Sequence, residues 1–385
     1  MLRFSTAGES HGKGLIAFIE GIPAGLKVDI EEINSELARR QRGFGRGQRM
    51  KIETDTAEII SGVRHKRTLG SPITLFIENK DFQNWIPAMS PILDEVSKNS
   101  LTNPRPGHAD LAGLMKYGVK DFRDILERAS ARETAAKVAI GAVCKIFLKE
   151  FGINVRSFIL QIGNVTAKIK SFDGEKIWCD TESSVVRCPD KAAEKEMIKL
   201  IEKAASNGDT LGGKLAILVS NVVAGLGSHT QWDLKLDGKL AQSLIAIQAF
   251  KSVEFGEGTN FAELPGSLAH DEIFHDKKNG FYRKTNHAGG IEGGMTNGEP
   301  IFITCVLKPI PSLVRPLRSV DIFTKKPVKA EAVRSDICVV PAAGIVAEAA
   351  VSIEIAKALI EQFGPVCMKD IKNNYNLYVK RIKNI

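Results

Sequence analysis

The chain has 385 residues, 43% hydrophobic and 25% charged, which is typical of folded globular proteins and excludes wholesale disorder and collagen-like sequence. Its 53 Lys and Arg residues against 45 Asp and Glu residues give a net charge of +8, which favours anionic partners such as phosphorylated metabolites, nucleic acid or a membrane surface. No apolar run reaches the ~18 residues of a membrane span, and the N-terminus lacks an apolar signal core, so we expect a cytoplasmic protein without membrane contact. The six cysteines show no C-x-x-C spacing, so we expect them to be reduced thiols.

The first part of the chain predicts a small sheet, one helix and a long irregular stretch. Strands are expected at residues 2–6, 15–19, 58–63 and 72–77. A helix is expected from Asp29 to about Arg40, because Asp29 and Glu32 form a capping-box-like pair. Residues 79–110 contain four prolines, and compact domains rarely keep so long a loop without a functional reason.

The second part alternates helices and strands without a regular β-α-β order. A helix is expected to begin at Ser130, an N-cap with Glu133 three residues on, and to end at Gly152. The further expectations are a strand at 155–162, an irregular insert with Cys179 and Cys188, a helix at 191–206, a strand at 214–223, a helix at 237–250, a turn at 254–261, a Gly-rich loop at 287–294, a strand at 301–307 and a buried apolar helix at 341–363. This pattern predicts a layered α+β fold with a single domain over residues 1–385.

Several short segments of the chain resemble known catalytic or ligand-binding motifs. Residues 8–12 match G-x-S-x-G, the nucleophile-elbow pattern, which leaves a serine hydrolase using Ser10 as one alternative. An elbow normally follows several strands, whereas this match begins at residue 8. The glycine spacings of the P-loop and of the Rossmann fingerprint are not met. His108 and Asp110 could provide two metal ligands, but no third lies near them in sequence, so we expect no metal.

A cationic cluster occupies residues 39–51, where six Arg and Lys residues stand without an acid. Arginine is suited to a bidentate grip on carboxylate and phosphate groups. A non-enzymatic RNA-binding protein is therefore a second alternative, and it would show tight, salt-sensitive RNA binding. Because Phe44 is the only aromatic residue of the cluster, a nucleic-acid partner is not expected.

Ser130 and Arg128 form a second candidate anion site. The unpaired N–H groups at a capped helix N-terminus favour an anion. The alternative is that Arg128 and Arg132 merely balance Glu127 and Glu133 at the surface. Similar polar islands, each combining Gly or Pro with Arg, His or Ser, recur along the chain, which favours one shared binding chemistry.

Taken together, these islands resemble the chorismate synthase family. The resemblance rests on T-A-G-E-S-H-G at 6–12, R-Q-R-G-F-G-R-G-Q-R-M-K at 40–51, R-P-G-H-A-D at 105–110, S-A-R-E-T at 130–134, H-A-G-G-I-E-G-G at 287–294 and V-R-S-D at 333–336. It implies a β-α-β sandwich with helices between antiparallel sheets, and a homotetramer. It also implies the anti-1,4-elimination of phosphate from 5-enolpyruvylshikimate 3-phosphate to give chorismate, the last common step of the shikimate pathway, with reduced FMN as cofactor.

The resemblance also implies roles for individual residues. His11 would protonate the leaving phosphate, His108 would keep the reduced flavin in its working protonation state, and Asp336 would act with the flavin in removing the ring proton. The implied substrate contacts are Ser10, Arg40, Arg46, Arg49 and Arg132, of which Arg40 and Arg46 are also associated with NADP. The implied flavin contacts are Arg128, Ala129, Ser130, Gln248, Ala249, Gly293, Lys308, Pro309, Ile310, Pro311, Ser312 and Arg334.

Two positions depart from the family pattern. The family usually has Arg-Ser-Ser where this chain has Arg128-Ala129-Ser130, and Asn-Ala where it has Gln248-Ala249. Ala129 lacks a hydroxyl and Gln248 is one methylene longer, so both changes bear on flavin contacts. NADPH is a candidate reductant, and an external flavin reductase is the alternative. The missing Rossmann fingerprint favours external reduction.

Overall fold

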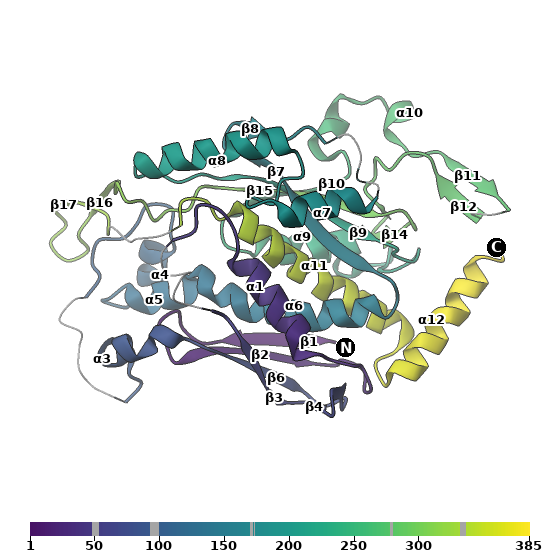
Figure 1. Cartoon of the computed structure of the whole chain (residues 1–385), viewed down its shortest axis with the longest axis horizontal. Coiled ribbons are helices and arrows are strands. Elements are labelled where there is room, and N and C mark those ends of the chain that lie inside the picture. Colours follow the sequence, from purple (N-terminus) through teal and green to yellow (C-terminus); the bar gives the residue numbers. More distant parts are fainter. Residues whose placement is uncertain (48–53, 93–99, 170–171, 173, 278–279, 332–335) are drawn as a thin grey trace.

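Two antiparallel sheets enclose a layer of helices (Figure 1). The computed structural model describes residues 1–47, 54–92, 100–169, 172, 174–277, 280–331 and 336–385. The first sheet has the strand order β1 (Arg3–Ala7), β2 (Gly14–Glu20), β6 (Ile73–Glu78) and β3 (Ala57–Ser61). Its inner face follows the two-residue period of a strand: Leu15, Ala17 and Ile19 of β2 are fully buried.

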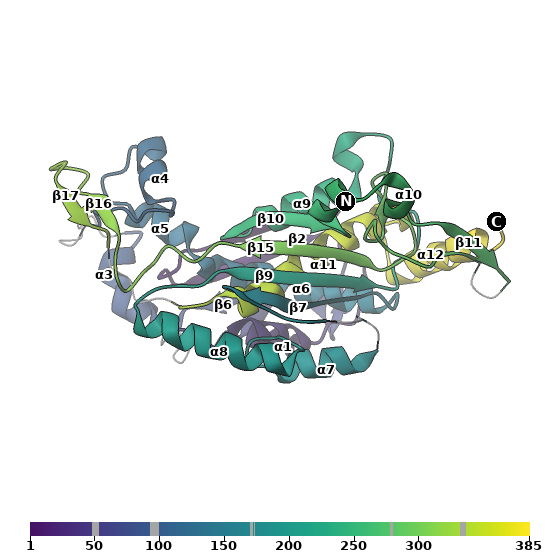
Figure 2. The same cartoon turned by 90° about the horizontal axis from the view of Figure 1, so that it is seen from above.

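The second sheet lies on the other side of the helices (Figures 1 and 2). Its strand order is β10 (Phe250–Phe255), β15 (Ile301–Leu307), β9 (Gly213–Ser220), β7 (Asn154–Ile162) and β8 (Val165–Thr166). Leu215, Ile217 and Val219 of β9 are buried. Because each sheet turns one apolar face inward, the helices between them are covered from both sides.

The central layer consists of α1 (Ile30–Gln41), α6 (Thr134–Lys149), α9 (Leu236–Ile245) and α11 (Val340–Phe363). Helix α11 packs on α6, on α9 and on β7, and nearly all of its residues are buried. Its crossing with α6 depends on Gly141, because a Cβ built there would lie 2.3 Å from Cβ of Ala349. The two backbones can approach this closely only because Gly141 has no side chain.

The remaining elements connect the layers or project from them. They are β4 (Val63–Arg64), β5 (Arg67–Thr68), η1 (Lys80–Trp85), α3 (Ile86–Met89), α4 (Asp110–Tyr117), α5 (Arg123–Ala129), η2 (Ala131–Glu133), α7 (Glu175–Ser183), α8 (Lys191–Ser206), η3 (Trp232–Leu234), η4 (Gly258–Glu263), α10 (Gly266–Ala269), β11 (Ile273–Asp276), β12 (Gly280–Arg283), β13 (Ile291–Glu292), β14 (Met295–Thr296), β16 (Arg318–Val320), β17 (Pro327–Lys329) and α12 (Met368–Ile382). In both views α3, α4, α5 and the β16–β17 pair gather at one end of the molecule, while β11–β12 and α12 project from the other (Figures 1 and 2).

The predicted α+β class and the sandwich with helices between antiparallel sheets are confirmed. The helix expected from Asp29 is α1, and the Asp29 side chain accepts a hydrogen bond from the backbone N–H of Glu31. The strand at 301–307 and the helix at 191–206 have the expected ends, and the last apolar helix begins one residue earlier, at Val340. In the part of the chain that the structure describes, no helix combines the length and apolar composition needed to cross a bilayer.

Other expectations are wrong. Ser130 caps only the short η2, since its Oγ accepts from the backbone N–H of Arg132, and α6 begins at Thr134. The insert expected to be irregular contains α7, whose Trp178 packs against Phe158. The helix expected to reach residue 250 ends at Ile245, and the turn expected at 254–261 begins inside β10. Ala249, at φ 73°, adopts the left-handed conformation that separates α9 from β10.

Candidate active site

His11 lies in the turn between β1 and β2 and is held by Glu127 of α5. The backbone N–H of His11 donates to Oε2 of Glu127 (2.8 Å), and its ring Nδ1 lies 2.8 Å from Oε1 of the same carboxylate. The imidazole stacks on Trp85 with ring centroids 3.9 Å apart. The turn between β1 and β2 is thereby fixed to α5, which lies more than a hundred residues further along the chain.

The turn around Ser10 does not form a nucleophile elbow. It joins two antiparallel strands, whereas an elbow joins a strand to a helix. Ser10 is 2% exposed, and its Oγ accepts a hydrogen bond from Ser130 Oγ at 3.2 Å. The G-x-S-x-G match therefore does not indicate a hydrolase here.

Arg40 and Arg132 share the buried carboxylate of Asp55. Nη1 of Arg40 lies 3.2 Å from Oδ2 of Asp55, and Nη1 of Arg132 donates to Oδ1. Nε of Arg132 also donates to Oδ1 of Asn79 at 2.9 Å, and Nε of Arg40 to Thr134 Oγ1 at 3.0 Å. Burial lowers the pKa of Arg40 to about 10. Two desolvated cations against one carboxylate leave an excess positive charge, which favours an anionic ligand.

Two alternatives from the sequence are wrong for Arg132 and Arg40: a charge balance at the surface and a solvated RNA-binding face. Glu127 and Arg132 are 3% and 8% exposed, so they do not form a surface charge balance. Arg40, at 5% exposed, is likewise no part of a solvated RNA-binding face.

Arg46 pairs with Asp336, the late carboxylate of the V-R-S-D motif. Nη1 of Arg46 lies 3.4 Å from Oδ2 of Asp336, and the backbone N–H of Gly47 donates to Oδ1 at 2.6 Å. Both groups act electrostatically on Arg40, since Arg46 lowers its pKa and Asp336 raises it. The structure thus places Asp336 against Arg46, within electrostatic range of Arg40. Arg49 and Arg334 lie outside the described residues.

Arg128, Ala129 and Ser130, at the end of α5, lie close to Glu133 and Gln248. Arg128 donates to the carbonyl of Thr6 (2.9 Å) and to that of Gly8 (3.2 Å). Glu133 accepts from Thr6 Oγ1 at 2.9 Å and from Gln248 Nε2 at 3.4 Å. Oε1 of Gln248 is buried and accepts no hydrogen bond from the described residues. A buried amide oxygen of this kind indicates a donor that a ligand would supply.

The same line of contacts continues to His108. The carbonyl of Ala249 accepts from the backbone N–H of Lys308 (3.0 Å), and Nζ of Lys308 donates to the carbonyl of Gly107 (2.6 Å). His108 follows Gly107 in the chain, and a Cβ built on Gly107 would lie 3.5 Å from Pro311. The segment Lys308, Pro309, Ile310, Pro311 and Ser312 therefore runs beside the His108 turn.

His108 is held by a carboxylate, as His11 is. Its Nδ1 contacts Oδ1 of Asp110, and Nη2 of Arg105 lies 3.0 Å from the same ring nitrogen. Arg105 also donates to Asp110 from Nε (2.9 Å) and to Ser312 Oγ from Nη1 (2.8 Å). Burial alone would raise the pKa of Asp110, but hydrogen bonds from His108 and Arg105 outweigh it and hold this pKa well below its ordinary range.

Gly293 is the one described position whose contacts do not join it to this cluster. The carbonyl of the neighbouring Gly294 accepts from the backbone N–H of Leu236, the first residue of α9. Gln248 follows the other end of that helix. Ten residues of α-helix separate the two ends by about 15 Å.

The arrangement can bind a polyanion and transfer protons at two places. Two imidazoles, each on a buried carboxylate, flank a series of cations. Sequence reasoning missed the residues that hold these groups in place: Asp55, Asn79, Trp85, Arg105 and Glu127. Asp110, paired with His108 in the metal hypothesis, contacts the His108 ring and Arg105. The described residues include no cluster of three or more His, Cys, Asp or Glu side chains suited to a metal ion.

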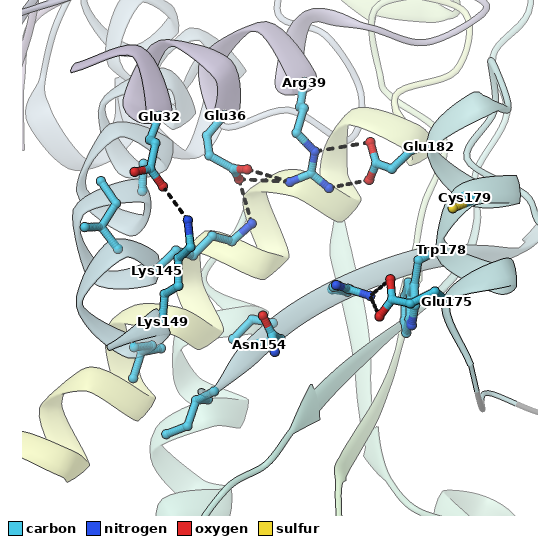
Figure 3. Close-up of a pocket in the computed structure, with 16 residues that line it drawn as sticks. Glu32, Glu36, Arg39, Lys145, Lys149, Asn154, Glu175, Trp178, Cys179 and Glu182 are labelled. Atoms are coloured by element: carbon cyan, nitrogen blue, oxygen red, sulfur yellow. Dashed lines mark hydrogen bonds and ion pairs between the residues drawn. The ribbon is translucent and has the colours of Figure 1, made fainter. Parts of the chain in front are cut away.

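A separate cavity of about 530 Å³ lies between α1, α6 and α7 (Figure 3). Its lining contains the four cations Arg39, Lys145, Lys149 and Arg156 and the four carboxylates Glu32, Glu36, Glu175 and Glu182. These groups pair with one another, for example Arg39 with Glu182 at 2.6 Å (Figure 3). Without an excess of positive charge, this cavity does not suit a polyanionic substrate.

Comparison with known proteins gives one consistent result. The family model described as "Chorismate synthase" matches residues 2–360. A chorismate synthase of Endomicrobium trichonymphae is 64% identical over 383 residues, and one of Sulfurihydrogenibium sp. is 51% identical over 389 residues; each alignment covers the whole of both chains. A solved structure, "Crystal Structure of Chorismate Synthase", superposes with a TM-score of 0.82 at 43% identity, covering 100% of this chain and 99% of the other.

Proposed function

The chain belongs to the chorismate synthase family, lyases that eliminate phosphate from 5-enolpyruvylshikimate 3-phosphate to give chorismate, and we propose that the residues between His11 and His108 form its active site. One observation carries this proposal. The contacts run without a break from His11 through Glu127 and α5 to Glu133 and Gln248, and from Ala249 through Lys308 to the turn of His108.

The substrate carries a phosphate and two carboxylates, and we assign their binding to Ser10, Arg40, Arg46, Arg49 and Arg132. Asp55 holds the guanidinium groups of Arg40 and Arg132 side by side. Cations that are already fixed and desolvated stabilise the charge that develops on the leaving phosphate without reorganising. His11 is the group we assign to protonate that phosphate, because it lies on the same turn as Ser10.

Among the residues assigned to FMN, those around Arg128, Gln248 and Lys308 fit a flavin phosphate and ring. Arg128 and Lys308 provide cations, and the unsatisfied Oε1 of Gln248 provides a buried acceptor. The residues that would hold the cofactor are Arg128, Ala129, Ser130, Gln248, Ala249, Gly293, Lys308, Pro309, Ile310, Pro311, Ser312 and Arg334. When bound, reduced FMN supplies the electrons that no side chain can provide. His108 is placed on the Lys308–Ser312 side, where Asp110 and Arg105 fix its ring.

Further features belong to the same proposal. Asp336, beside Arg46, is the carboxylate that we assign to removal of the ring proton. Arg40 and Arg46 are the positions we associate with NADPH, and an external flavin reductase is the alternative source of electrons. A homotetramer and a cytoplasmic location are expected from the family.

The test is anaerobic turnover of 5-enolpyruvylshikimate 3-phosphate with photoreduced FMN. We expect His11→Ala and His108→Ala to fold normally and to lose about 10²–10⁴-fold in kcat, the usual contribution of a positioned proton donor or acceptor. His229→Ala, at an exposed position, is the control and should keep its activity. FMN binding should tighten when the substrate is added. Wild-type turnover in both histidine variants would refute the assigned roles.

A further inference from the structure

Glu127 makes three contacts with the turn that carries His11. Its two carboxylate oxygens accept from the backbone N–H of His11 and contact the ring Nδ1, both at 2.8 Å. Its backbone carbonyl accepts from the N–H of Ser10 at 3.0 Å. A carboxylate that binds both the backbone and the ring of one histidine fixes the position of the turn and the rotation of the imidazole together.

The surroundings prevent this carboxylate and this ring from moving apart. Glu127 is 3% exposed, and the His11 side chain is 16% exposed. Trp85 stacks on the imidazole with an interplanar angle of 30°. Arg123, one helical turn before Glu127, lies 5.3 Å from the Trp85 ring and places Nη1 3.7 Å from Oε1 of Glu127. The ring is therefore held between an aromatic face and a buried carboxylate.

We propose that Glu127 is the positioning residue of the proton donor: it keeps a proton on Nδ1 of His11, stabilises the imidazolium, and thereby assigns Nε2 as the atom that protonates the departing phosphate. This inference rests on the proposed role of His11. A buried carboxylate at one ring nitrogen selects the tautomer and favours the charged ring.

The proton balance follows from this arrangement. In the net elimination the ring proton goes to the base, for which we assign Asp336. The electron pair of the broken C–H bond forms a new double bond and shifts the existing one, and the C–O bonding pair leaves with the phosphate. The proton moves from Nε2 to a phosphate oxygen. His11 becomes neutral and keeps its Nδ1–H on Glu127, so the ring does not have to rotate before it takes up the next proton.

The charged groups around the ring decide the direction of the expected pH effect. They are Glu127 and Arg123 from α5, with Glu9 beside Gly12 in the same turn, and Trp85 of η1 adds an aromatic face. The Glu127 carboxylate contacts the ring directly, with Oε1 2.8 Å from Nδ1. Replacing it by a neutral amide removes the negative charge that favours the protonated ring.

The decisive variant is Glu127→Gln, which keeps the shape of the side chain and removes its charge. Because activity requires protonated His11, kcat should fall on the basic side of its pH profile, which is the basic limb of that profile. We expect this basic limb to move to lower pH by roughly one unit or more, and kcat at pH 8 to fall about 10²-fold. Asp124→Asn makes the same charge change on the same helix and should leave the limb in place.

A second measurement does not depend on turnover. The chain has seven histidines, so ring-labelled histidine gives a tractable NMR titration in which His11→Asn identifies the His11 signal. The midpoint of that signal should be lower in Glu127→Gln than in the wild type. If Glu127→Gln does not fold, Glu127→Asp replaces it: the charge is kept, and a shorter reach should lower kcat with little movement of the midpoint.

The outcomes separate the two proposals. In one outcome, His11→Ala loses activity, but Glu127→Gln moves neither the NMR midpoint nor the basic limb of the kcat profile. This outcome overturns the role of Glu127 and leaves His11 as the donor. Full activity in His11→Ala overturns both. A lower midpoint and a shifted limb, with Asp124→Asn unchanged, support the positioning role.

Discussion

At the scale of single residues, each candidate catalytic imidazole lies against one buried carboxylate: Glu127 for His11 and Asp110 for His108. The second pair also includes Arg105, which donates to Asp110 and to Ser312. Asp110 thus contacts the His108 ring and the Arg105 guanidinium at once. Its depressed pKa means that its stabilising contribution is present above the unfolded pKa of about 4 and is lost as the pH falls toward the folded value.

Asp110→Asn tests this arrangement. Arg105 is 6% exposed, so removing its buried counter-ion should cost about 3–5 kcal/mol in the free energy of unfolding at pH 7. His108 would lose its fixed tautomer, and kcat with photoreduced FMN should fall about 10-fold or more. Urea unfolding at pH 7, 5 and 3 measures the stability difference, which should shrink between pH 5 and pH 3. A difference independent of pH would contradict the depressed pKa.

At the scale of elements, a buried network around Glu348 ties the helix layer to the second sheet. Glu348 of α11 is fully buried and lies 2.9 Å from Arg39 of α1 and 3.1 Å from Arg187. It also contacts Lys145 of α6 and accepts from Ser157 Oγ of β7 at 2.7 Å. Burial would raise the pKa of Glu348, but Arg39, Lys145 and Arg187 hold it far below its ordinary value.

Glu348→Gln should therefore be strongly destabilising. It leaves three cations around an uncharged amide, and breaking a buried pair on one side typically costs about 3–5 kcal/mol. The matched control is Glu175→Gln, which breaks the pair with Arg156 where Glu175 is 77% exposed; exposed pairs contribute about 0–1 kcal/mol. Urea midpoints at pH 7 measure both variants. Equal losses in the two would contradict the role of the buried network.

Some of these elements and site residues could be predicted from the sequence, and others could not. Strands such as β15 and helices such as α11 were predicted because local periodicity and apolar content determine them. The break at Ala249 was missed because a left-handed alanine has no sequence signal. His11, His108 and the arginines were predicted as site residues from their motifs. Glu127 and Asp55 were not, because a buried carboxylate becomes a partner only through contacts between distant segments, and local patterns contain no such contacts.

At the scale of the whole molecule, the candidate site draws on both layers of the sandwich. The turn between β1 and β2 contributes Ser10 and His11 from the first sheet. The segment before β10 and the segment after β15 contribute Gln248 and Lys308 from the second. Helix α5 and the start of α6 lie between them. A ligand that contacts all of these groups is bound by both sheets at once.

This placement predicts that substrate and reduced FMN together stabilise the whole fold. Ligand at 100 times its Kd contributes about 2.7 kcal/mol, which for a chain of this length raises Tm by about 3 °C. Hydrogen exchange should slow in peptides from β2 and from β15 alike, because either sheet must release the ligand before it opens. Inorganic phosphate at the same concentration is the control and should produce neither effect. Protection confined to β2 and its neighbours would place the site on one sheet and contradict a site shared by both sheets.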